Sequence, residues 1–420
     1  MLTSMFTAVS GMDANGTSLS IIGDNIANTN TVGFKKSRAS FGDVLSQSIE
    51  NSAGSAQVGR GVILQEVSPM FTQGAFETTE NALDLAIDGD GFFTVNDQGA
   101  MYYTRAGNFS LDRSGYIVNP DNLRLQGYLA DTAGNITGTT GDLQLNATQS
   151  PARMTGAANV SVNLDAAAPV QTSPFTLDGN GDGTPNDPLN YSSSTTVSLY
   201  DSQGGAHQAT LYYAKTGNNT WDVHYVYEDP ANAGQLIEAT GSPQTLTFDT
   251  AGALVSASAG SPVFSFGGGV TQNQAVGFNY TGTTQLASSF AVLRLDQDGY
   301  SSGALKNLII SEAGVMTGVF TNGQTRNVGQ IALAKFIAPT ELVKLGRNLY
   351  GESFDSGQAI VSAPGTSGLG RVASNTLELS NVDLAAEFVK MITAQRGFQA
   401  NSRIITTTDE LMSEIVNLKR

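Results

Sequence analysis

The sequence contains no cysteine, which excludes disulfides, thiolate metal sites and cysteine nucleophiles. It has a single tryptophan and two histidines. Charged residues make up 14% of the 420 residues, against roughly a quarter in an average globular chain. Small and turn-forming residues take their place, with 47 glycines and many Thr, Ser and Asn. This composition predicts β-rich modules with short strands and many turns, and it disfavours an α/β enzyme.

Positive charge is also scarce. The formal net charge is −16, and no basic run is longer than Lys35-Lys36. A surface that follows a phosphate backbone is therefore not predicted, and nucleic acid is excluded as a partner. Residues 1–30 have neither the basic start nor the apolar core of a secretory signal. If the protein leaves the cytosol, we expect it to keep its N-terminus.

Nucleotide-binding motifs are missing, including Walker A and a strand-linked G-x-G-x-x-G. His207 and His224 fall in strand-like segments without metal-ligand spacing, so structural roles are expected. Residues 178–183 (DGNGDG) resemble the start of a calcium loop, but the position of the bidentate glutamate is occupied by Leu189. An acidic turn is favoured there, with weak calcium binding left open. We predict no enzyme activity, no catalytic residue, no metal site and no cofactor.

Both ends of the chain carry apolar residues at seven-residue spacing, which predicts an amphipathic helix of coiled-coil type at each end. Ser380 and Asn381 are candidate N-caps of the second helix. The predicted assembly residues are Met5, Val9, Met12, Leu19, Ile26, Leu384, Phe388, Met391, Phe398, Ile405, Leu411 and Met412.

These helices could pack on the protein's own core or between subunits. Segments rich in Asn, Thr, Gly and Ser flank both of them, at residues 28–31 and 363–370, which indicates flexible tethers. The polar face of the second helix is largely uncharged, with residues such as Gln399 and Asn401. Such a helix suits burial between subunits better than exposure to solvent. We expect both helices to be disordered until the protein assembles.

Between the helices the pattern changes to strands. The stretch 91–105 contains two apolar runs separated by Asp97-Gln98-Gly99, which predicts a hairpin. The predicted fold class is α+β, with an outer β domain inserted into an inner one and a helix at each end. The expected ranges are 1–32 (N-terminal helix), 33–72 (linker), 73–149 and 285–362 (inner β domain), 150–284 (outer β domain) and 363–420 (linker and C-terminal helix).

Several segments resemble the rod and hook proteins, the axial protein family of the bacterial flagellum. At the N-terminal end, residues 21–28 (IIGDNIAN) and 33–35 (GFK) are similar to the family's shared signature. At the C-terminal end, residues 380–384 (SNVDL) and 394–401 (AQRGFQAN) are similar to the second signature, and residues 83–93 and 104–109 extend the likeness. The signature positions singled out are Asn25, Ile26, Ala27, Asn28, Gly33, Phe34, Gln395 and Arg396.

The resemblance implies a structural subunit of a helical tube that is built by self-assembly and lined by the terminal helices. The middle β region and residues 200–207 favour a flexible hook-type subunit, acting as a universal joint between rod and filament, over a distal rod subunit. The implied partners are further copies of the chain, distal rod, hook cap and hook–filament junction proteins, and the flagellar type III export apparatus. The implied location is extracellular, attached to the basal body, without cleavage of a signal peptide. A secreted β-rich adhesin is the remote alternative, but it leaves both heptad ends unexplained.

Overall fold

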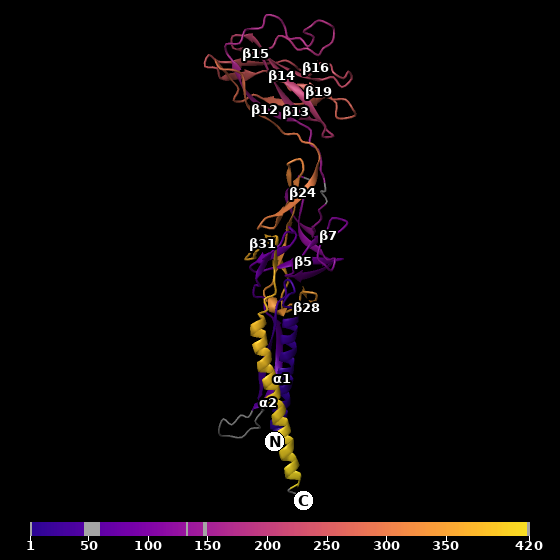
Figure 1. The fold of residues 1–420 in the computed structure, drawn as a ribbon, viewed down its shortest axis with the longest axis vertical. Helices are drawn as coiled ribbons and strands as arrows, with labels where there is room; N and C mark the ends of the chain where they lie inside the picture. The colour runs from indigo at the N-terminus through magenta and orange to yellow at the C-terminus, as the bar shows by residue number, and fades with distance from the viewer. Residues whose placement is uncertain (1, 46–58, 132, 146–148, 418–420) are drawn as a thin grey trace. The chain divides into compact units, whose positions relative to one another are not determined.

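The structure is a computed structural model that describes residues 2–45, 59–131, 133–145 and 149–417. It divides into two compact units. The first comprises Met1–Ala147, Asn307–Val319 and Thr325–Arg420, and the second comprises Thr148–Lys306 and Phe320–Gln324. Strands are the main regular structure of the described residues, with a helix near each end of the chain (Figure 1). This agrees with the predicted fold class.

Two long helices, α1 (Leu2–Ala27) and α2 (Leu384–Asn417), run side by side in opposite directions in the first unit (Figure 1). Neither contains proline, which would break the helical hydrogen bonds. The Asp383 carboxylate accepts the backbone N–H groups of Ala385 and Ala386 at 2.9 and 3.2 Å, so Asp383 caps α2. The expected cap at Ser380 or Asn381 lies two to three residues too early. No described helix is both long enough and apolar enough to span a bilayer.

A hairpin lies beside α1, within the range expected as the linker 33–72. Its strands are β1 (Ser37–Leu45) and β2 (Gly59–Pro69), paired antiparallel with two register shifts. Gly61 approaches Ser10 of α1 so closely that a Cβ would lie 2.0 Å from the serine Oγ. The Ser10 hydroxyl in turn accepts the Val62 N–H at 3.2 Å. This segment is therefore docked on the helix and is not a free linker.

The β part of the first unit is built around one large sheet, whose main path runs β11-β24-β25-β26-β9-β5-β6-β29-β28; of this path, β11 and residues 303–306 of β24 fall within the second unit. The hairpin predicted at Asp97-Gln98-Gly99 is present between β5 and β6, with positive φ at Gln98 and Gly99. The strands are β5 (Phe92–Asp97), β6 (Ala100–Thr104), β7 (Ser110–Leu111), β8 (Ile117–Val118), β9 (Arg124–Ala130), β10 (Ile136–Asp142), β11 (Gln149–Ser150), β24 (Gly303–Ile310), β25 (Val315–Phe320), β26 (Thr325–Ile331), β27 (Leu333–Lys335), β28 (Val343–Gly346), β29 (Leu349–Gly351) and β30 (Ile360–Ser362).

Two buried clusters hold this sheet together. The larger one includes Leu85, Phe93, Leu125 and Leu333, which are fully buried. The smaller one is aromatic, with the rings of Phe92 and Tyr350 in an edge-to-face contact at 5.9 Å. Because both clusters combine residues before 130 with residues after 330, the inner β unit closes only when the two halves of the chain meet.

The segment expected as a second linker, 363–383, also takes part in sheets. β31 (Arg371–Ser374) pairs with β4 (Leu85–Asp88), and β32 (Thr376–Glu378) pairs with β3 (Phe76–Thr78). These strands have three or four residues and find their partners almost 300 positions away, so local sequence patterns carry no signal for them. The chain directly before α2 is thus fixed to the inner β unit.

The second unit is a β-sandwich. One sheet has the order β13-β14-β15-β17-β18, with β16 added to β15, and the other is centred on β12, flanked by β21, β22 and β23. A two-stranded pair, β19–β20, completes it. The strands are β12 (Ala157–Asp165), β13 (Ser193–Tyr200), β14 (Ala206–Gly217), β15 (Thr220–Glu228), β16 (Leu236–Glu238), β17 (Gln244–Phe248), β18 (Leu254–Ala257), β19 (Val263–Phe264), β20 (Gln274–Ala275), β21 (Gly277–Asn279), β22 (Thr284–Leu286) and β23 (Ala291–Gln297).

The sandwich core joins the two sheets through alternating buried residues. Trp221 is fully buried, and its Nε1–H donates to Gln285 Oε1 at 3.0 Å. β23 pairs with β12, so residues 291–297 lie in this unit, although they were expected in the inner domain. The alternation of apolar and polar residues in 291–297 fits a strand of either unit equally well, so the sequence alone does not show which strand this segment pairs with.

Candidate assembly site in the terminal helices

The seam between α1 and α2 combines small, polar and a few apolar side chains. Its most buried residues are Ala8, Ile22 and Asn25 on α1 and Glu387, Ala394 and Thr408 on α2. Buried positions on α2 recur every seven residues, as the heptad pattern predicted. However, the buried column is 387, 394 and 408, and the predicted column lies beside it. Of that predicted column, Leu384, Phe398 and Met412 are exposed, whereas Met391 and Ile405 are half-buried. The helices therefore meet mainly through small and polar side chains, and several large apolar side chains remain exposed.

Two glycines, Gly11 and Gly397, allow the helices to approach closely, and we call each of these positions a glycine notch. A Cβ on Gly11 would lie 2.7 Å from Asn401 Nδ2, and a Cβ on Gly397 would lie 2.8 Å from Asn15 Oδ1. Each glycine thus accommodates an asparagine of the opposite helix. The two contacts pair residues in antiparallel register, and they leave little room for larger residues at these levels of the seam.

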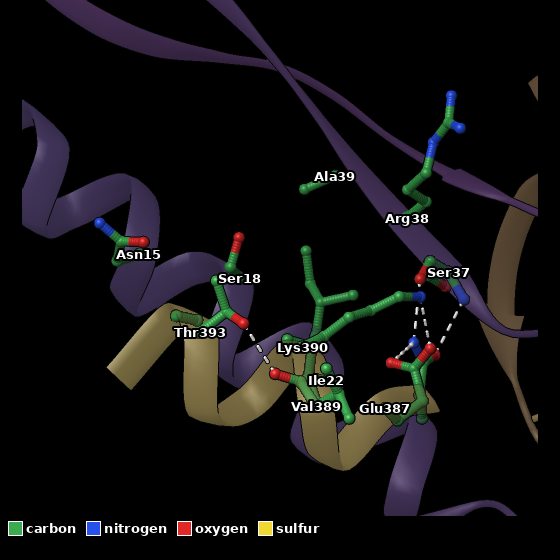
Figure 2. Close-up of a pocket in the computed structure, with 13 residues that line it drawn as sticks. Asn15, Ser18, Ile22, Ser37, Arg38, Ala39, Glu387, Val389, Lys390 and Thr393 are labelled. Carbon is green, nitrogen blue, oxygen red and sulfur yellow. Dashed lines mark hydrogen bonds and ion pairs between the residues drawn. The ribbon is translucent and has the colours of Figure 1, made fainter. Parts of the chain in front are cut away.

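The end of the helix pair nearest the β unit is held by buried hydrogen bonds (Figure 2). The Asn25 amide donates to the Ser37 carbonyl at 3.0 Å and accepts the Ser37 N–H at 2.9 Å. It also donates to Glu387 at 3.4 Å, and Glu387 accepts from Lys390 at 2.7 Å. Glu387 is only 1% exposed, so its charge depends on these two partners. Three segments, α1, β1 and α2, are joined at this point.

A second buried cluster of charged side chains joins the C-terminal end of α1 and the N-terminal end of α2 to the inner β unit. Lys35, which follows α1, lies 2.6 Å from Glu378, which precedes α2, and both side chains are fully buried. Arg105 contributes a second cation at 3.5 Å from the same carboxylate. Burial lowers the pKa of Lys35, and the negative charge of Glu378 opposes that shift. Burial likewise lowers the pKa of Arg105 against the opposing effect of Glu378.

Gly33 and Asn381 complete this junction. Gly33 has φ +67°, and a Cβ there would lie 2.5 Å from the Ala106 backbone nitrogen, so only glycine fits. Its N–H donates to the Glu378 carbonyl at 2.7 Å. The Asn381 side chain accepts the Lys36 N–H at 2.8 Å and donates to the Met70 carbonyl at 2.8 Å. These hydrogen bonds hold the backbone around residues 33–36 and 70 against the backbone around residues 378–381.

The comparison with known proteins decides the family. A flagellar hook protein (FlgE) of Borreliella burgdorferi is 35% identical over an alignment of 461 residues that covers all of both chains. The flagellar hook protein of Escherichia coli is 34% identical and covers 98% of this chain and 99% of its own. The chain belongs to the flagellar hook protein family.

Family models agree with this hook assignment along the chain. The model described as "Flagella basal body rod protein" matches residues 5–35, and "Flagellar basal body rod FlgEFG protein C-terminal" matches 373–418. "Flagellar hook protein FlgE/F/G D1 domain" matches 86–167, and "Flagellar basal body protein FlaE D2 domain" matches 163–300. The crystal structure of a Helicobacter pylori hook protein, FlgE2, aligns with a TM-score of 0.50 at 16% identity, over 70% of this chain and 98% of its own. That last likeness concerns the fold alone.

The family signature residues occupy two kinds of position in this hook-family chain. Asn25, Gly33 and Phe34 are buried at the junction, and the Asn28 amide donates to the Asp24 carbonyl at 2.9 Å, where α1 ends. By contrast, Gln395 and Arg396 are exposed on α2, next to the Gly397 notch. Ile26 and Ala27, in the last turn of α1, are half-buried and exposed respectively.

The predicted assembly residues do not form a closed core within this hook-family chain. Val9, Met12, Leu19, Ile26, Met391 and Ile405 are half-buried, whereas Met5, Leu384, Phe388, Phe398, Leu411 and Met412 are exposed. Phe6, Val389 and Ile392 add to the exposed set. The two helices thus present apolar side chains that the other helix does not cover.

Sequence reasoning missed the charged residues of the junction. Glu378 and Glu387 lie outside the segments singled out in the sequence, and Arg105 lies within residues 104–109, but nothing in these sequences indicates that the three charges are buried. The one local indication was that Glu378 stands between two leucines, Leu377 and Leu379, in a short strand-like stretch. Lys35 and Asn381 lie inside the signature segments, but nothing in their spacing indicates an ion pair or a bridge.

The other candidate groups lie in the β-sandwich and have partners there. His207 contacts Asp201 at 2.8 Å and stacks on Phe266, and His224 contacts Glu238 at 2.6 Å. In the acidic loop, Asp178 accepts the N–H groups of Gly181 and Gly183 at 2.8 and 3.0 Å. Its carboxylate is thus engaged in forming the turn, and the described residues contain no cluster of three or more metal-ligating side chains.

Proposed function

We propose that this chain is the structural subunit of a flagellar hook and that it self-assembles through α1 and α2 into a flexible helical tube. The observation that carries the proposal is the distribution of side chains on the two helices. Their shared seam is formed mainly by small and polar side chains, while large apolar residues such as Phe6 and Phe398 remain exposed. Apolar surface of this extent on a helix pair favours burial against other subunits.

The junction between the helices and the inner β unit also supports the proposal. The ion pair of Lys35 with Glu378 and the bridges of Asn25 and Asn381 fasten the helices to the inner β unit. Force applied to the helices would reach the β unit through buried contacts. The β-sandwich surface is rich in Thr, Ser and Asn, so contacts between neighbouring sandwiches would be hydrated and weak, as bending requires.

Further parts of the proposal follow from family membership. The partners would be other copies of this chain, the distal rod, cap and junction proteins at the two ends of the hook, and the flagellar type III export apparatus. The location would be extracellular, attached to the basal body, with export that leaves the N-terminus intact. The proposed role is mechanical and involves no catalysis or cofactor.

Electron microscopy of the purified chain tests self-assembly. Under polymerising conditions the full chain should form curved tubes, whereas a chain of residues 28–383, which lacks both helices, should remain monomeric with its β units folded. These bounds retain β31 and β32, which belong to the inner sheet. Straight tubes from the full chain would favour a rod subunit, and tubes from the shortened chain would contradict the role of the helices.

A further inference from the structure

The β-sandwich has two opposite flanks, where the described strands of its sheets end. On one flank, β23 is the last strand of the smaller sheet and lies beside β13, the last strand of the larger one. On the other flank, β18 ends the larger sheet, and the Gly252 carbonyl next to it accepts the Gln285 N–H of β22 at 2.8 Å. We call these two surfaces the β23 flank and the β18 flank.

The β23 flank carries an apolar ridge. Its three residues, Val292, Leu293 and Leu295, are 43, 62 and 36% exposed. Val292 and Leu295 pair with Val162 and Val160 of β12, which are fully buried, so they face the core side of the sheet at its open end. A register shift places Leu293 at a bulge between them. Three aliphatic side chains therefore remain uncovered at the edge of the sandwich core.

The β18 flank is hollowed by a groove with a volume of about 500 Å³. Residues 253–257, which include β18, line one side of it, and residues 278–284, from β21 to β22, line the other. Leu254, Phe278 and Tyr280 contribute apolar surface, and Val255, which also lines the groove, is 67% exposed. The groove is large enough for two or three aliphatic side chains.

The groove and most of the ridge come from a stretch of sequence without charge. No charged residue occurs between Asp249 and Arg294. Elsewhere the charged residues of this unit are mostly acidic, and several, such as Asp182 and Asp187, are exposed. Two copies of an acidic surface repel each other. Contact between two sandwiches is therefore least costly where both surfaces are neutral, at the ridge and the groove.

The ridge and the groove lie at the same level along β12, on its two sides. The ridge is opposite residues 160–162 of β12, while β21 and β22, at the groove, pair with residues 157–159 and 163–165. A second copy displaced sideways, across the strands, therefore brings its ridge against this groove without being turned over. Such a contact joins two different surfaces and keeps both copies in the same orientation, as a helical polymer requires.

We propose that the ridge of one subunit docks in the groove between β18 and β21–β22 of the neighbouring subunit. This inference rests on the proposed function, because it specifies one contact of the proposed polymer. It places Leu293 against Thr281, an exposed residue midway along the segment 278–284.

The contact is small, which suits a joint that bends. Three aliphatic side chains bury far less than the roughly 1,200 Å² of a stable specific interface, so the ridge adds to the cohesion of the helices and does not replace it. Apolar contact is also non-directional. The ridge can therefore shift along the groove when the distance between neighbouring sandwiches changes.

Disulfide mapping tests the placement, since the chain contains no cysteine of its own. A chain with both Leu293→Cys and Thr281→Cys is polymerised and then oxidised. Each subunit should link to one neighbour on each flank, so a denaturing gel should show a ladder of covalent dimers, trimers and longer products. The two cysteines cannot join within one chain, because two strand spacings of about 9–10 Å separate the sides of β12 and a disulfide requires Cα atoms within about 7 Å.

Two controls accompany the double variant. Chains with only one of the two cysteines should give no covalent product, because the contact joins different surfaces. Ala291→Cys in place of Leu293→Cys is the matched control, since Ala291 is exposed on the same strand but pairs with Asn163, on the face of the sheet away from the core. This control should lose the ladder.

Three results would overturn the proposal while leaving self-assembly intact: polymers without the ladder, an equal ladder from the Ala291→Cys control, or dimers from Leu293→Cys alone, which would mean that two ridges face each other. If wild-type chains form no polymer at all, the proposed function itself fails. The wild-type sample in the same experiment distinguishes the two failures.

Charge substitution gives a second test that needs no cysteine. Leu293→Asp should raise the critical concentration for polymerisation about tenfold, because an apolar contact is lost and a carboxylate is brought to an uncharged groove. Adding Thr281→Lys should restore most of the loss, since the two charges would face each other. Ala291→Asp, with the same charge on the other face of β23, should change the value less than about twofold. Equal effects of Leu293→Asp and Ala291→Asp, or no rescue by Thr281→Lys, would contradict the docking.

Discussion

At the scale of single residues, buried polar groups fix the junction between the two helices and the inner β unit. Glu378 is fully buried, and it contacts two cations, Lys35 and Arg105. It also accepts the N–H of Gly74 at 2.8 Å. The Glu378 carboxylate thus connects the segment that precedes α2 with residues that come earlier in the chain, Lys35, Gly74 and Arg105. Its removal would leave Lys35 without its anionic partner and Arg105 without the carboxylate that lies 3.5 Å away.

We expect Glu378→Gln to lower the free energy of unfolding of the first unit by about 3–5 kcal/mol, because uncompensated buried charge is costly. Urea denaturation followed by circular dichroism measures this, since the only tryptophan, Trp221, lies in the other unit. Glu312→Gln is the control, because its ion pair with Arg371 is exposed and should contribute at most about 1 kcal/mol. Equal effects of the two changes would contradict a structural role for the buried group.

Gly33→Ala should be destabilising for two separable reasons. The positive φ costs about 1–2 kcal/mol for a residue with a Cβ, and the new methyl group would also meet the Ala106 backbone nitrogen at 2.5 Å. Gly346→Ala isolates the first cost, because Gly346 has φ +86° with nothing within 4 Å of a Cβ. In thermal melts, Gly33→Ala should lower the melting temperature distinctly more than Gly346→Ala. Similar shifts would show that the contact with Ala106 is unimportant.

At the scale of elements, α1 and α2 form a pair whose seam is mainly small and polar and whose flanks are apolar. Burying an exposed Leu or Phe side chain contributes about 1.5–3 kcal/mol, and each subunit offers several on the two helices. The cohesion of a polymer would therefore come from the flanks, while the glycine notches and the Asn25–Glu387 contact set the register of the pair within each subunit.

Phe398→Asp or Leu384→Asp should abolish assembly while the β units remain folded, because a carboxylate at an apolar contact between subunits would be buried without a partner. Sedimentation under polymerising conditions measures assembly, and circular dichroism confirms the fold. Gln399→Asp, an exposed position next to Phe398, introduces the same charge on a polar face and should have a smaller effect. Normal tubes from both apolar variants would rule out the flanks as the contact surface.

The heptad period of both helices was predictable from sequence, because long periodic segments carry a strong signal. Which column is buried was not predictable. Apolar residues such as Leu384 and Phe398 mark one column, but Ala394, Asn401 and Thr408 mark the column that faces α1. Small side chains allow close approach of two helices, and a pattern based on hydrophobicity does not detect them. The short strands β31 and β32 escaped prediction because their partners are distant in sequence.

At the scale of the whole molecule, the chain is organised so that both ends meet in the first unit while the β-sandwich is an insertion. The insertion begins and ends at neighbouring residues, because Ser150 of β11 pairs with Gly303 of β24. The sandwich has its own core around Trp221, so it can be removed without opening the core of the inner unit.

Replacing residues 151–302 by a short Asn-Gly turn should yield a chain that still polymerises, because both helices and their junction are retained. The tubes should differ in curvature, since contacts between sandwiches are lost. Electron micrographs of the two polymers, grown under the same conditions, measure this. A shortened chain that is folded but does not assemble would show that the sandwich contributes essential contacts.

The most direct test of the central claim is amide hydrogen exchange of α1 and α2, compared between the monomer and the polymer of the same chain. If the exposed apolar flanks become buried between subunits, the amides of both helices should exchange markedly more slowly in the polymer, while those of β14 and β15 in the sandwich core should change little. Equal exchange of the helices in the two states would contradict assembly through the terminal helices.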